Sequence, residues 1–410
     1  MELKPGYKQS EVGVIPEDWE VKSFDELFAF RNGVNADKAS YGQGIRFINV
    51  LEPITYSHIY GPEITGQVKL PELVASSYAV YQGDVLFNRT SETQEDIGLA
   101  ATYLGTERVV FGGFVIRGRP IDKSLDPIYS GYALRSAIIR SQIIPMGQGA
   151  IRANIGQQNL SLVVAPVPPL PEQEAIAEAL SDADALIESL EQLITKKRKI
   201  KQGAMQELLT GKKRLPGFSG EWEVKRVAEF GEIITGGTPN TEVNVFWGEG
   251  YPWITPTDIS RYRDMDTSER NITQKGLNAI RVLPSNTVLV TCIASIGKNA
   301  ILKVMGSCNQ QINAIVPNTR NSAEFLYYLF EANKQYLIAN SGTTATSIIS
   351  KKTFEELIFK IPSVYEQNAI ALLLSDMDDE ITVLEEKLKK GHQLKQGMMQ
   401  NLLSGKIRLV

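Results

Sequence analysis

The feature that most constrains this chain is an internal duplication. Residues 201–215 read KQGAMQELLTGKKRL and residues 395–409 read KQGMMQNLLSGKIRL, with eleven of the fifteen positions identical at a spacing of 194. A second repeated word, Trp-Glu-Val-Lys, begins at Trp19 and again at Trp222, a spacing of 203. A repeat on this scale dictates the architecture. The chain is therefore predicted to be two copies of one unit, each a variable globular segment followed by a helix.

The duplication divides the 410 residues into four segments. The stretches VAPVPPLPEQ (164–173) and KIPSVYEQ (360–367) precede the two predicted helices. Proline stops a strand and is tolerated in a first helical turn, so these stretches mark domain boundaries. The predicted organisation is a first globular domain at 1–170, a central helix at 171–215, a second globular domain at 216–365 and a C-terminal helix at 366–410.

Both helical segments carry an apolar residue at alternating steps of four and three, which is the period of a coiled-coil seam. The two patterns, 172–209 and 366–403, each cover 38 residues, or about 57 Å of helix. The predicted seam residues are Ile176, Leu180, Ala183, Ile187, Leu190 and Ile194 in the first helix, and Ile370, Leu374, Met377, Ile381, Leu384 and Leu388 in the second.

Charge predicts how the two helices pair. Each begins acidic and ends basic: the first has KKRKIK at 196–201, and the second passes from acidic residues at 376–380 to lysines at 387–395. The gradient suits each helix dipole, and antiparallel pairing sets acid against base. An intramolecular antiparallel coiled coil with approximate two-fold symmetry is predicted. The alternatives are that each helix covers its own globular domain, and that KKRKIK contacts DNA and not a partner surface.

The globular segments are β-rich. Short alternating or β-branched runs at 46–50, 84–88, 252–255 and 286–291 predict strands, with GDVLFNRT (83–90) and SNTVLVTC (285–292) in corresponding places. Short helices are expected near 129–139 and 323–339. The fold class is α+β, with two β-rich globular domains joined by two long helices.

Both globular segments contain loop residues whose chemistry suits the reading of DNA. Arginine and lysine pair with guanine, asparagine and glutamine with adenine, and hydroxyl groups with phosphate. The same residue types also fill turns and caps, and the sequence leaves both roles open. The candidates are Arg46, Asn88, Arg89, Thr90, Arg152 and Asn154 in the first segment, and Thr255, Thr257, Lys298, Asn299, Gln310, Gln311, Thr343 and Thr344 in the second.

No catalytic site is recognisable in the sequence. Two cysteines, Cys292 and Cys308, and two histidines, His58 and His392, are too few for a zinc cluster or a disulfide framework, and no metal site is predicted. The Gly-Lys pair at 297–298 is not part of a phosphate-binding loop, and the single Pro-Pro is not followed by the aromatic residue that an amino-methyltransferase requires. We therefore expect no catalytic residues.

The net charge limits the classes of partner that the chain is expected to bind. The 43 basic and 47 acidic residues give a charge of −4, which argues against a protein that binds nucleic acid alone. A subunit that shares phosphate contacts with a partner remains compatible. The charged start MELKPGYKQSE lacks the apolar core of a signal peptide, so a cytosolic location is expected.

The repeated words resemble a known family. The opening GYKQSEVGVIPEDWEVKSFDELF (6–28), the mid-chain LTGKKRLPGFSGEWEVKRVAEF (209–230), the PEQ- and YEQ-led helices and the duplicated KQG-x-MQ-x-LL-x-GK are similar to type I restriction-modification specificity (S) subunits. The resemblance covers the chain in order, and the duplicated arrangement of the words is more specific than any one of them.

The resemblance implies a non-catalytic subunit that recognises double-stranded DNA. Two target recognition domains would each read one half of an asymmetric split target, and the helices would set the gap and dock two modification (methyltransferase) subunits. S-adenosylmethionine, ATP and Mg would be bound by partner subunits, including the restriction subunits of the full complex. The alternatives are the S subunit of a type II system that cuts and modifies, and a coiled-coil scaffold that does not bind DNA.

Overall fold

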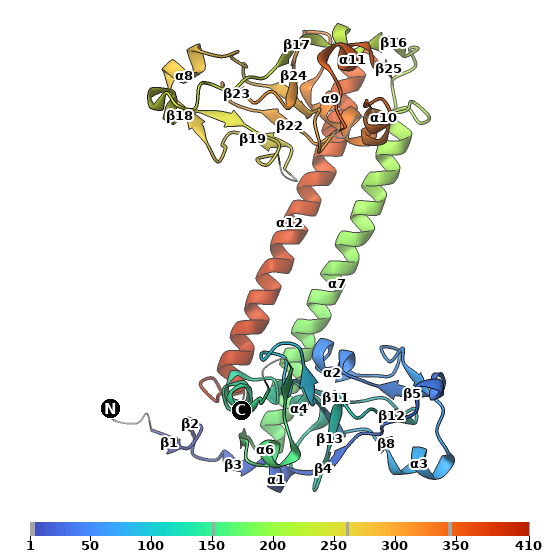
Figure 1. Ribbon diagram of the computed structural model, residues 1–410, viewed down its shortest axis with the longest axis vertical. Coiled ribbons are helices and arrows are strands. Elements are labelled where there is room, and N and C mark those ends of the chain that lie inside the picture. The colour runs from blue at the N-terminus through green and yellow to red at the C-terminus, as the bar shows by residue number, and fades with distance from the viewer. Residues whose placement is uncertain (1–4, 150–151, 260–261, 343–346, 410) are drawn as a thin grey trace. The chain divides into compact units, whose positions relative to one another are not determined.

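The computed structural model describes residues 5–149, 152–259, 262–342 and 347–409 and divides the chain into two compact units. Unit 1 comprises Met1–Glu191 and Lys387–Val410, and unit 2 comprises Gln192–Glu386 (Figure 1). Each unit contains one globular region and a part of each long helix. The unit boundaries therefore fall inside the helices.

The two long helices are α7 (Leu170–Leu208) and α12 (Val364–Leu402), each 39 residues (Figure 1). Both begin and end within two residues of the apolar patterns at 172–209 and 366–403, which confirms the two predicted helices. After each helix comes a glycine with positive φ, Gly211 at 71° and Gly405 at 69°. This conformation suits glycine because it has no Cβ, and it turns the chain out of the helix.

Unit 1 is built on two main sheets. The first has the order β4-β13-β9-β11-β6 and is antiparallel except for its last pair, and the second has the order β7-β5-β12-β8 with a parallel β5–β12 pair. The strands of the first sheet are β4 (Phe28–Asn32), β13 (Val115–Pro120), β9 (Val85–Asn88), β11 (Ala100–Tyr103) and β6 (His58–Ile59). Those of the second are β7 (Gln67–Val68), β5 (Tyr41–Ile48), β12 (Val109–Phe111) and β8 (Ala79–Val80).

Smaller elements complete unit 1. The strand pairs are β1 (Tyr7–Ser10) with β2 (Gly13–Pro16), β10 (Thr90–Ser91) with β14 (Ala153–Asn154), and β15 (Val164–Val167) with β3 (Glu20–Ser23). The short helices are α1 (Phe24–Leu27), α2 (Leu51–Thr55), α3 (Glu72–Ser77), α4 (Pro127–Ala133), α5 (Ala137–Ile143) and α6 (Gln157–Ser161), with 3-10 turns η1 (Lys38–Ser40) and η2 (Ile144–Met146).

Unit 2 repeats this plan. Its first sheet has the order β17-β24-β21-β22-β19 and its second β20-β18-β23, again with one parallel pair in each. The strands are β17 (Gly231–Thr235), β24 (Ile312–Pro317), β21 (Thr287–Thr291), β22 (Asn299–Leu302), β19 (Asp264–Met265), β20 (Asn271–Ile272), β18 (Trp247–Ile254) and β23 (Ser307–Cys308), with β16 (Glu223–Arg226) pairing β25 (Ile358–Ile361). The helices are α8 (Gln274–Asn278), α9 (Ala323–Ala332), α10 (Lys334–Ala339) and α11 (Lys351–Glu356), with 3-10 turns η3 (Val227–Glu229) and η4 (Asn244–Phe246).

The strand orders confirm the predicted shared architecture. The predicted strands at 84–88 and 286–291 are β9 and β21, each at the centre of its five-stranded sheet. Those at 46–50 and 252–255 overlap β5 and β18, which hold equivalent places in the second sheets. The predicted short helices are also present, the first as α4 and α5 and the second as α9 and α10.

Eight of the twelve predicted seam residues are buried, and Ala183, Leu190, Met377 and Leu388 are half-buried. Burial has two causes. The residues near the start of each helix, such as Ile176 and Leu374, pack into the core of their own globular region. Farther along, Ile187 contacts Gly391 of the other helix. The seam prediction and its alternative, that each helix covers its own domain, are therefore each right for part of the helix.

Ion pairs within each unit confirm antiparallel pairing. In unit 2 the basic end of α7 meets the acidic start of α12, through Lys197–Glu380 and Arg198–Glu385, both at 2.5 Å. In unit 1 the end of α12 meets the start of α7 through Lys395–Asp184 at 2.5 Å. Three residues of KKRKIK, namely Lys197, Arg198 and Lys201, thus pair with α12, whereas Lys196, Lys199 and Ile200 are exposed.

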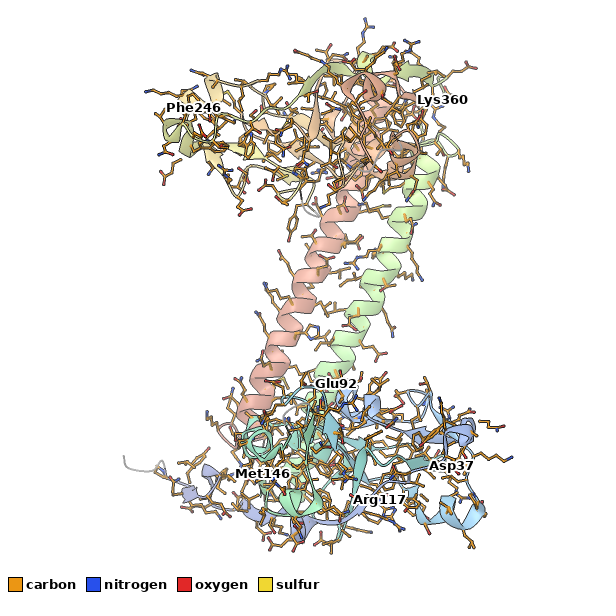
Figure 2. All side chains as sticks on the ribbon, viewed as in Figure 1. Asp37, Glu92, Arg117, Met146, Phe246 and Lys360 are labelled. Atoms are coloured by element: carbon orange, nitrogen blue, oxygen red, sulfur yellow. The ribbon has the colours of Figure 1, made fainter. Side chains whose placement is uncertain are left out.

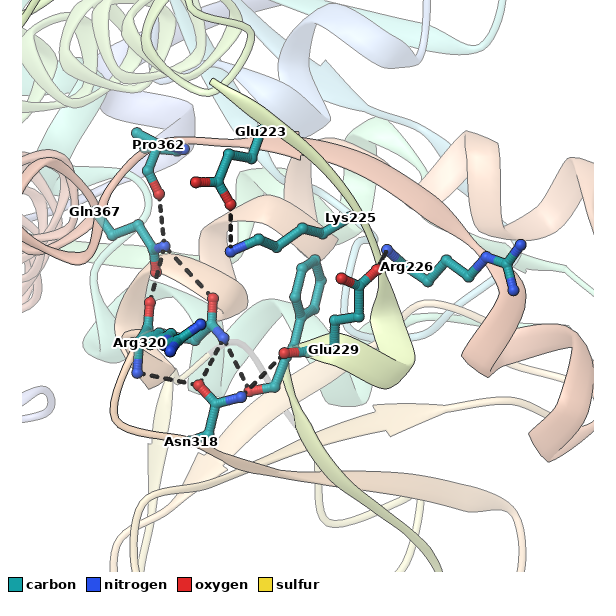
Figure 3. A network of polar contacts seen from close by, with 10 residues as sticks. Glu223, Lys225, Arg226, Glu229, Asn318, Arg320, Pro362 and Gln367 are labelled. Carbon is teal, nitrogen blue, oxygen red and sulfur yellow. Dashed lines mark hydrogen bonds and ion pairs between the residues drawn. The ribbon is translucent and has the colours of Figure 1, made fainter. Parts of the chain in front are cut away.

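The repeated Glu-Gln word anchors each helix to its globular region. In unit 2 the Gln367 side chain donates to the Pro362 carbonyl at 2.9 Å (Figure 3). It also accepts a hydrogen bond from the Ser322 amide at 3.0 Å. In unit 1, Gln173 accepts from the Asp126 amide and donates to the Pro168 carbonyl, each at 2.8 Å. The buried amide thus satisfies backbone groups that helix formation leaves without partners.

The glutamate of the same word binds an arginine that follows the other helix. In unit 2, Glu366 accepts both Arg214 Nε and Nη2, at 2.5 and 2.6 Å. In unit 1 the fully buried Glu172 accepts Arg408 Nε at 2.5 Å and Trp19 Nε1 at 2.8 Å. The repeated words of the sequence are therefore the parts that hold helix and globular region together.

Unit 1 contains a half-buried histidine, His58, whose environment predicts a pH dependence of stability. His58 Nε2 lies 2.8 Å from the Ile128 carbonyl, and the imidazole packs edge-on against Tyr132 at 4.6 Å. Burial lowers the pKa of His58. The charged form is therefore more favourable in the unfolded chain, and the stability of unit 1 is expected to fall as the pH drops through about 6.5.

Thermal unfolding between pH 8 and pH 5 tests this expectation. His58→Gln should show a smaller decrease in midpoint than the wild type over that range. His392→Gln is the matched control, because His392 is the other histidine of the chain and is exposed, and it should keep the wild-type pH dependence. Equal pH dependence in wild type and His58→Gln would contradict the expectation.

Candidate nucleic-acid interface

In unit 2, two loops emerge at the same sheet edge. Strands β18 and β23 are parallel and pair Ile254 with Cys308, so the loops that follow them start side by side. The Asn309 amide donates to the Ile254 carbonyl at 2.9 Å and fixes this arrangement. We call the loop residues 255–258 and 309–311 the unit 2 edge. Four candidates lie on it: Thr255, Thr257, Gln310 and Gln311.

Hydrogen bonds order the polar side chains of the unit 2 edge. Thr255 Oγ1 donates to Asp258 Oδ2 at 2.6 Å and contacts Thr257 Oγ1 at 2.7 Å. Thr238 Oγ1 donates to Gln310 Oε1 at 2.6 Å, and Gln310 itself is exposed. This hydrogen bond orients the Gln310 amide group, whose N–H donors have no partner among the residues that the structure describes and are available to a ligand, as base readout requires.

In unit 1 four candidates gather in a different place, around β10 and β14. Thr90 Oγ1 donates to Asn154 Oδ1 at 2.7 Å, across the pairing of these two strands. Arg89 Nη1 donates to the Gly113 carbonyl at 3.2 Å, in the loop after β12. Arg152 is exposed and lies 3.6 Å from Glu92, which is labelled in Figure 2. These residues form a polar surface that carries both donors and acceptors.

The structure sets four other candidates apart. Asn88 and Asn299 are buried in strands and donate to the Asp96 carbonyl and to Glu331, so the structure places these two side chains in the interior and not on the polar surfaces described above. Arg46 binds the Gly61 carbonyl and Glu107, and it is held there by the fold. Lys298 lines a cavity of about 700 Å³ beside α9 and α12, not the unit 2 edge. Thr343 and Thr344 lie outside the described residues.

Sequence reasoning missed one motif that shapes both regions. Strand β5 reads YGQGIRFI and β18 reads WGEGYPWI, each with a bulge where two residues oppose one on the neighbouring strand. An aromatic residue begins each bulge and another lies two residues beyond its end. These residues are Tyr41 and Phe47 in unit 1 and Trp247 and Trp253 in unit 2, and the two rings of each pair are in contact. The repeated Gly-x-Gly between aromatic residues was the available signal, because glycine accommodates the positive φ that the bulge needs.

The cysteines are unsuited to nucleophilic chemistry. Burial raises the pKa of Cys292 to about 11 and that of Cys308 to about 12, so both thiols stay protonated at neutral pH. Among the described residues, no group of three or more His, Cys, Asp and Glu side chains is placed to hold a metal ion. In the same part of the chain, no helix is both long and apolar enough to cross a membrane.

Comparison with known proteins identifies the architecture. Residues 16–201 and 219–391 match the family described as "Type I restriction modification DNA specificity domain", once for each copy of the duplication. The chain belongs to this family. A putative type I restriction enzyme MjaX specificity subunit from Methanocaldococcus jannaschii is 28% identical over 98% of this chain and 97% of its own length. The MjaIX specificity subunit of the same organism is 37% identical over 42% of this chain and 41% of its own.

Solved structures of the specificity family share the fold. The S subunit from M. genitalium has a TM-score of 0.58 at 16% identity, covering 98% of both chains. A subunit from Thermoanaerobacter tengcongensis has a TM-score of 0.52 at 17% identity, covering 96% of this chain and 98% of its own. At this identity the likeness concerns the fold. It agrees with two sheet-rich regions and two long helices.

Proposed function

We propose that this chain is the DNA sequence-specificity subunit of a type I restriction-modification complex. In this proposal each globular region reads one half of a split target. The observation that carries it is that two units of one strand order present different side chains where the chain leaves equivalent strands. Thr255 and Gln310 follow β18 and β23 in unit 2, and Asn49 and Gly113 stand in the same places after β5 and β12 in unit 1. Equal scaffolds with unlike surfaces suit a target whose half-sites differ in sequence.

The long helices support the assembly part of the proposal. Helix α7 has an exposed apolar stripe, Leu186, Leu193 and Ile200, at seven-residue intervals, with exposed fractions of 50%, 38% and 47%. Residues seven apart share one helix face, and an exposed apolar face is typical of a protein–protein contact. We propose that this stripe docks modification subunits and that the helices set the gap between half-sites.

Catalysis is assigned to the partners in this proposal. S-adenosylmethionine would be bound by the modification subunits, and ATP and Mg by the partner subunits of the complex, while this chain contributes recognition. The near-neutral charge of the chain supports a division in which partners supply part of the phosphate contacts.

The docking stripe gives a direct test of assembly. Replacing Leu193 and Ile200 with serine is expected to weaken binding of the modification subunit by at least about tenfold, because two apolar contacts are lost. Affinity is measured by titrating the purified modification subunit. Leu73→Ser is the matched control, since Leu73 is 85% exposed in α3 and should leave affinity unchanged. Equal affinity of the stripe variant and wild type would contradict docking at this stripe.

Selection from randomised duplexes tests the recognition part of the proposal. The complex of this chain with its modification subunit is expected to enrich two unlike half-sites at a fixed separation. The modification subunit alone should enrich none. Enrichment of one continuous site, or of no sequence, would contradict a bipartite reader.

A further inference from the structure

We propose that Arg270 of unit 2 reads a guanine in one half of the DNA target. The inference rests on the proposed function and deepens it by naming a specificity residue and the base that it recognises. Arg270 immediately precedes β20 and lies outside the candidates that the sequence suggested.

The Arg270 side chain is held in place by aromatic stacking. Its guanidinium carbon lies 3.9 Å from the ring centre of Trp247 and 5.6 Å from that of Trp253. The two indoles pack edge-to-face with their ring centroids 5.0 Å apart. Each indole is also fixed by a hydrogen bond: Trp247 Nε1 donates to the Asn240 carbonyl, and Trp253 Nε1 donates to the Gly237 carbonyl. Stacking restrains the guanidinium before a ligand arrives, which lowers the entropy cost of binding.

The hydrogen-bonding capacity of the guanidinium is unused. Arg270 is exposed, and within residues 5–149, 152–259, 262–342 and 347–409 its guanidinium makes no hydrogen bond or ion pair. Stacking occupies the face of the group and leaves its N–H donors in the plane. A planar fork of donors matches the O6 and N7 acceptors of guanine in the major groove.

Backbone hydrogen bonds connect the segment around Arg270 to the unit 2 edge. The Trp253 amide donates to the Arg270 carbonyl at 3.3 Å, and the neighbouring Glu269 amide donates to Asp258 Oδ1 at 2.7 Å. Asp258 is the residue that also accepts the Thr255 amide and hydroxyl. The backbone of residues 269 and 270 therefore lies next to the loop that carries Thr255 and Thr257.

Unit 1 lacks this device at the equivalent position. The Phe47 amide donates to the Gly66 carbonyl at 2.9 Å, just as the Trp253 amide donates to the Arg270 carbonyl in unit 2. Gly66 is therefore the residue of unit 1 that is equivalent to Arg270. A cavity of about 600 Å³ opens there, bordered by Tyr41, Phe47 and Gly66. A Cβ on Gly66 would come within 2.8 Å of the Phe47 carbonyl oxygen, so a side chain there would require a shift of the backbone. This stacked arginine is therefore a feature of unit 2, and we expect the guanine that it reads to lie in the half-site that unit 2 reads.

Binding of systematically substituted duplexes to the complex with the modification subunit tests the proposal. For the wild type, changing one G·C pair in one half-site should weaken binding by about tenfold or more. Arg270→Gln should abolish that preference and keep the preferences at the other positions. Arg270→Lys should weaken that preference without abolishing it, because lysine can donate to guanine but lacks the planar fork. Arg320→Gln, an exposed arginine in the loop before α9, is the matched control and should keep the wild-type profile.

Three results would overturn the proposal. An equal loss of affinity for all duplexes in Arg270→Gln would assign Arg270 to a phosphate, and an unchanged profile would remove it from the interface. Full discrimination in Arg270→Lys would exclude bidentate readout. A wild-type complex without sequence preference is a separate outcome, since it would overturn the proposed function and this inference together.

Discussion

Arg408→Ala is expected to destabilise unit 1 by about 3 kcal/mol. Arg408 binds Glu172, whose side chain is fully buried, and Asp18, whose side chain is half exposed. Hydrogen bonds to these two carboxylates raise the pKa of Arg408, so the guanidinium is charged at any pH of interest. Without it, Glu172 would keep the Trp19 indole as a partner but would remain a buried charge without a counter-ion.

Chemical denaturation of the full-length chain measures this loss, and Asp18→Ala is the matched control. Asp18 shares the arginine but is exposed, and exposed ion pairs contribute about 0–1 kcal/mol. Its pKa is lowered, mainly by the Arg408 hydrogen bond, so that small contribution is present above the pKa of an unfolded aspartate, about 3.9, and is lost in acid. Arg408→Ala within about 0.5 kcal/mol of wild type would contradict the anchoring role of Glu172.

Leu374→Ala is expected to destabilise unit 2 by about 2–5 kcal/mol. The Leu374 side chain is fully buried in the cluster where α12 packs against Phe325 and Tyr328 of α9. Removing three carbons from this cluster loses apolar burial and leaves a cavity.

The matched control lies on the same helix two residues away. Leu372 is 64% exposed, so Leu372→Ala should change stability by no more than about 0.5 kcal/mol. The free energies of unfolding of both variants come from the same denaturation experiment. Equal values for the two variants would show that this face of α12 does not carry the packing described above.

The sequence predicts the helices well because their signals are local and repeated. An apolar residue every 3.5 positions and an acidic-to-basic gradient are visible within 40 residues, and the structure confirms both the helices and their antiparallel contacts. The repeated Glu-Gln motifs at the helix starts were equally recognisable in the sequence, but their structural roles were not. Glu172 binds Trp19 and Arg408, which are 153 and 236 residues away in the chain, and no local pattern encodes such a contact.

The exposure of the candidate DNA-contacting residues was harder to predict, for a different physical reason. A polar residue at the end of a strand faces either the core or solvent, and the surrounding sheet decides which. Asn88 and Asn299 point inward, whereas Gln310 and Asn154 are exposed. Arg270 escaped notice because its stacking depends on the bulge that places Trp247 and Tyr251 opposite the same residue, Ile272. That register is a property of the folded sheet.

Methylome sequencing tests the central claim most directly. Cells that carry this gene with its modification partner should contain N6-methyladenine in one motif of two unlike half-sites around a fixed gap. Deletion of this gene alone should remove the motif and leave the partner's abundance unchanged. The claim that this chain specifies the methylated target is contradicted if the motif persists after deletion, or if an active modification subunit produces no motif that depends on this chain.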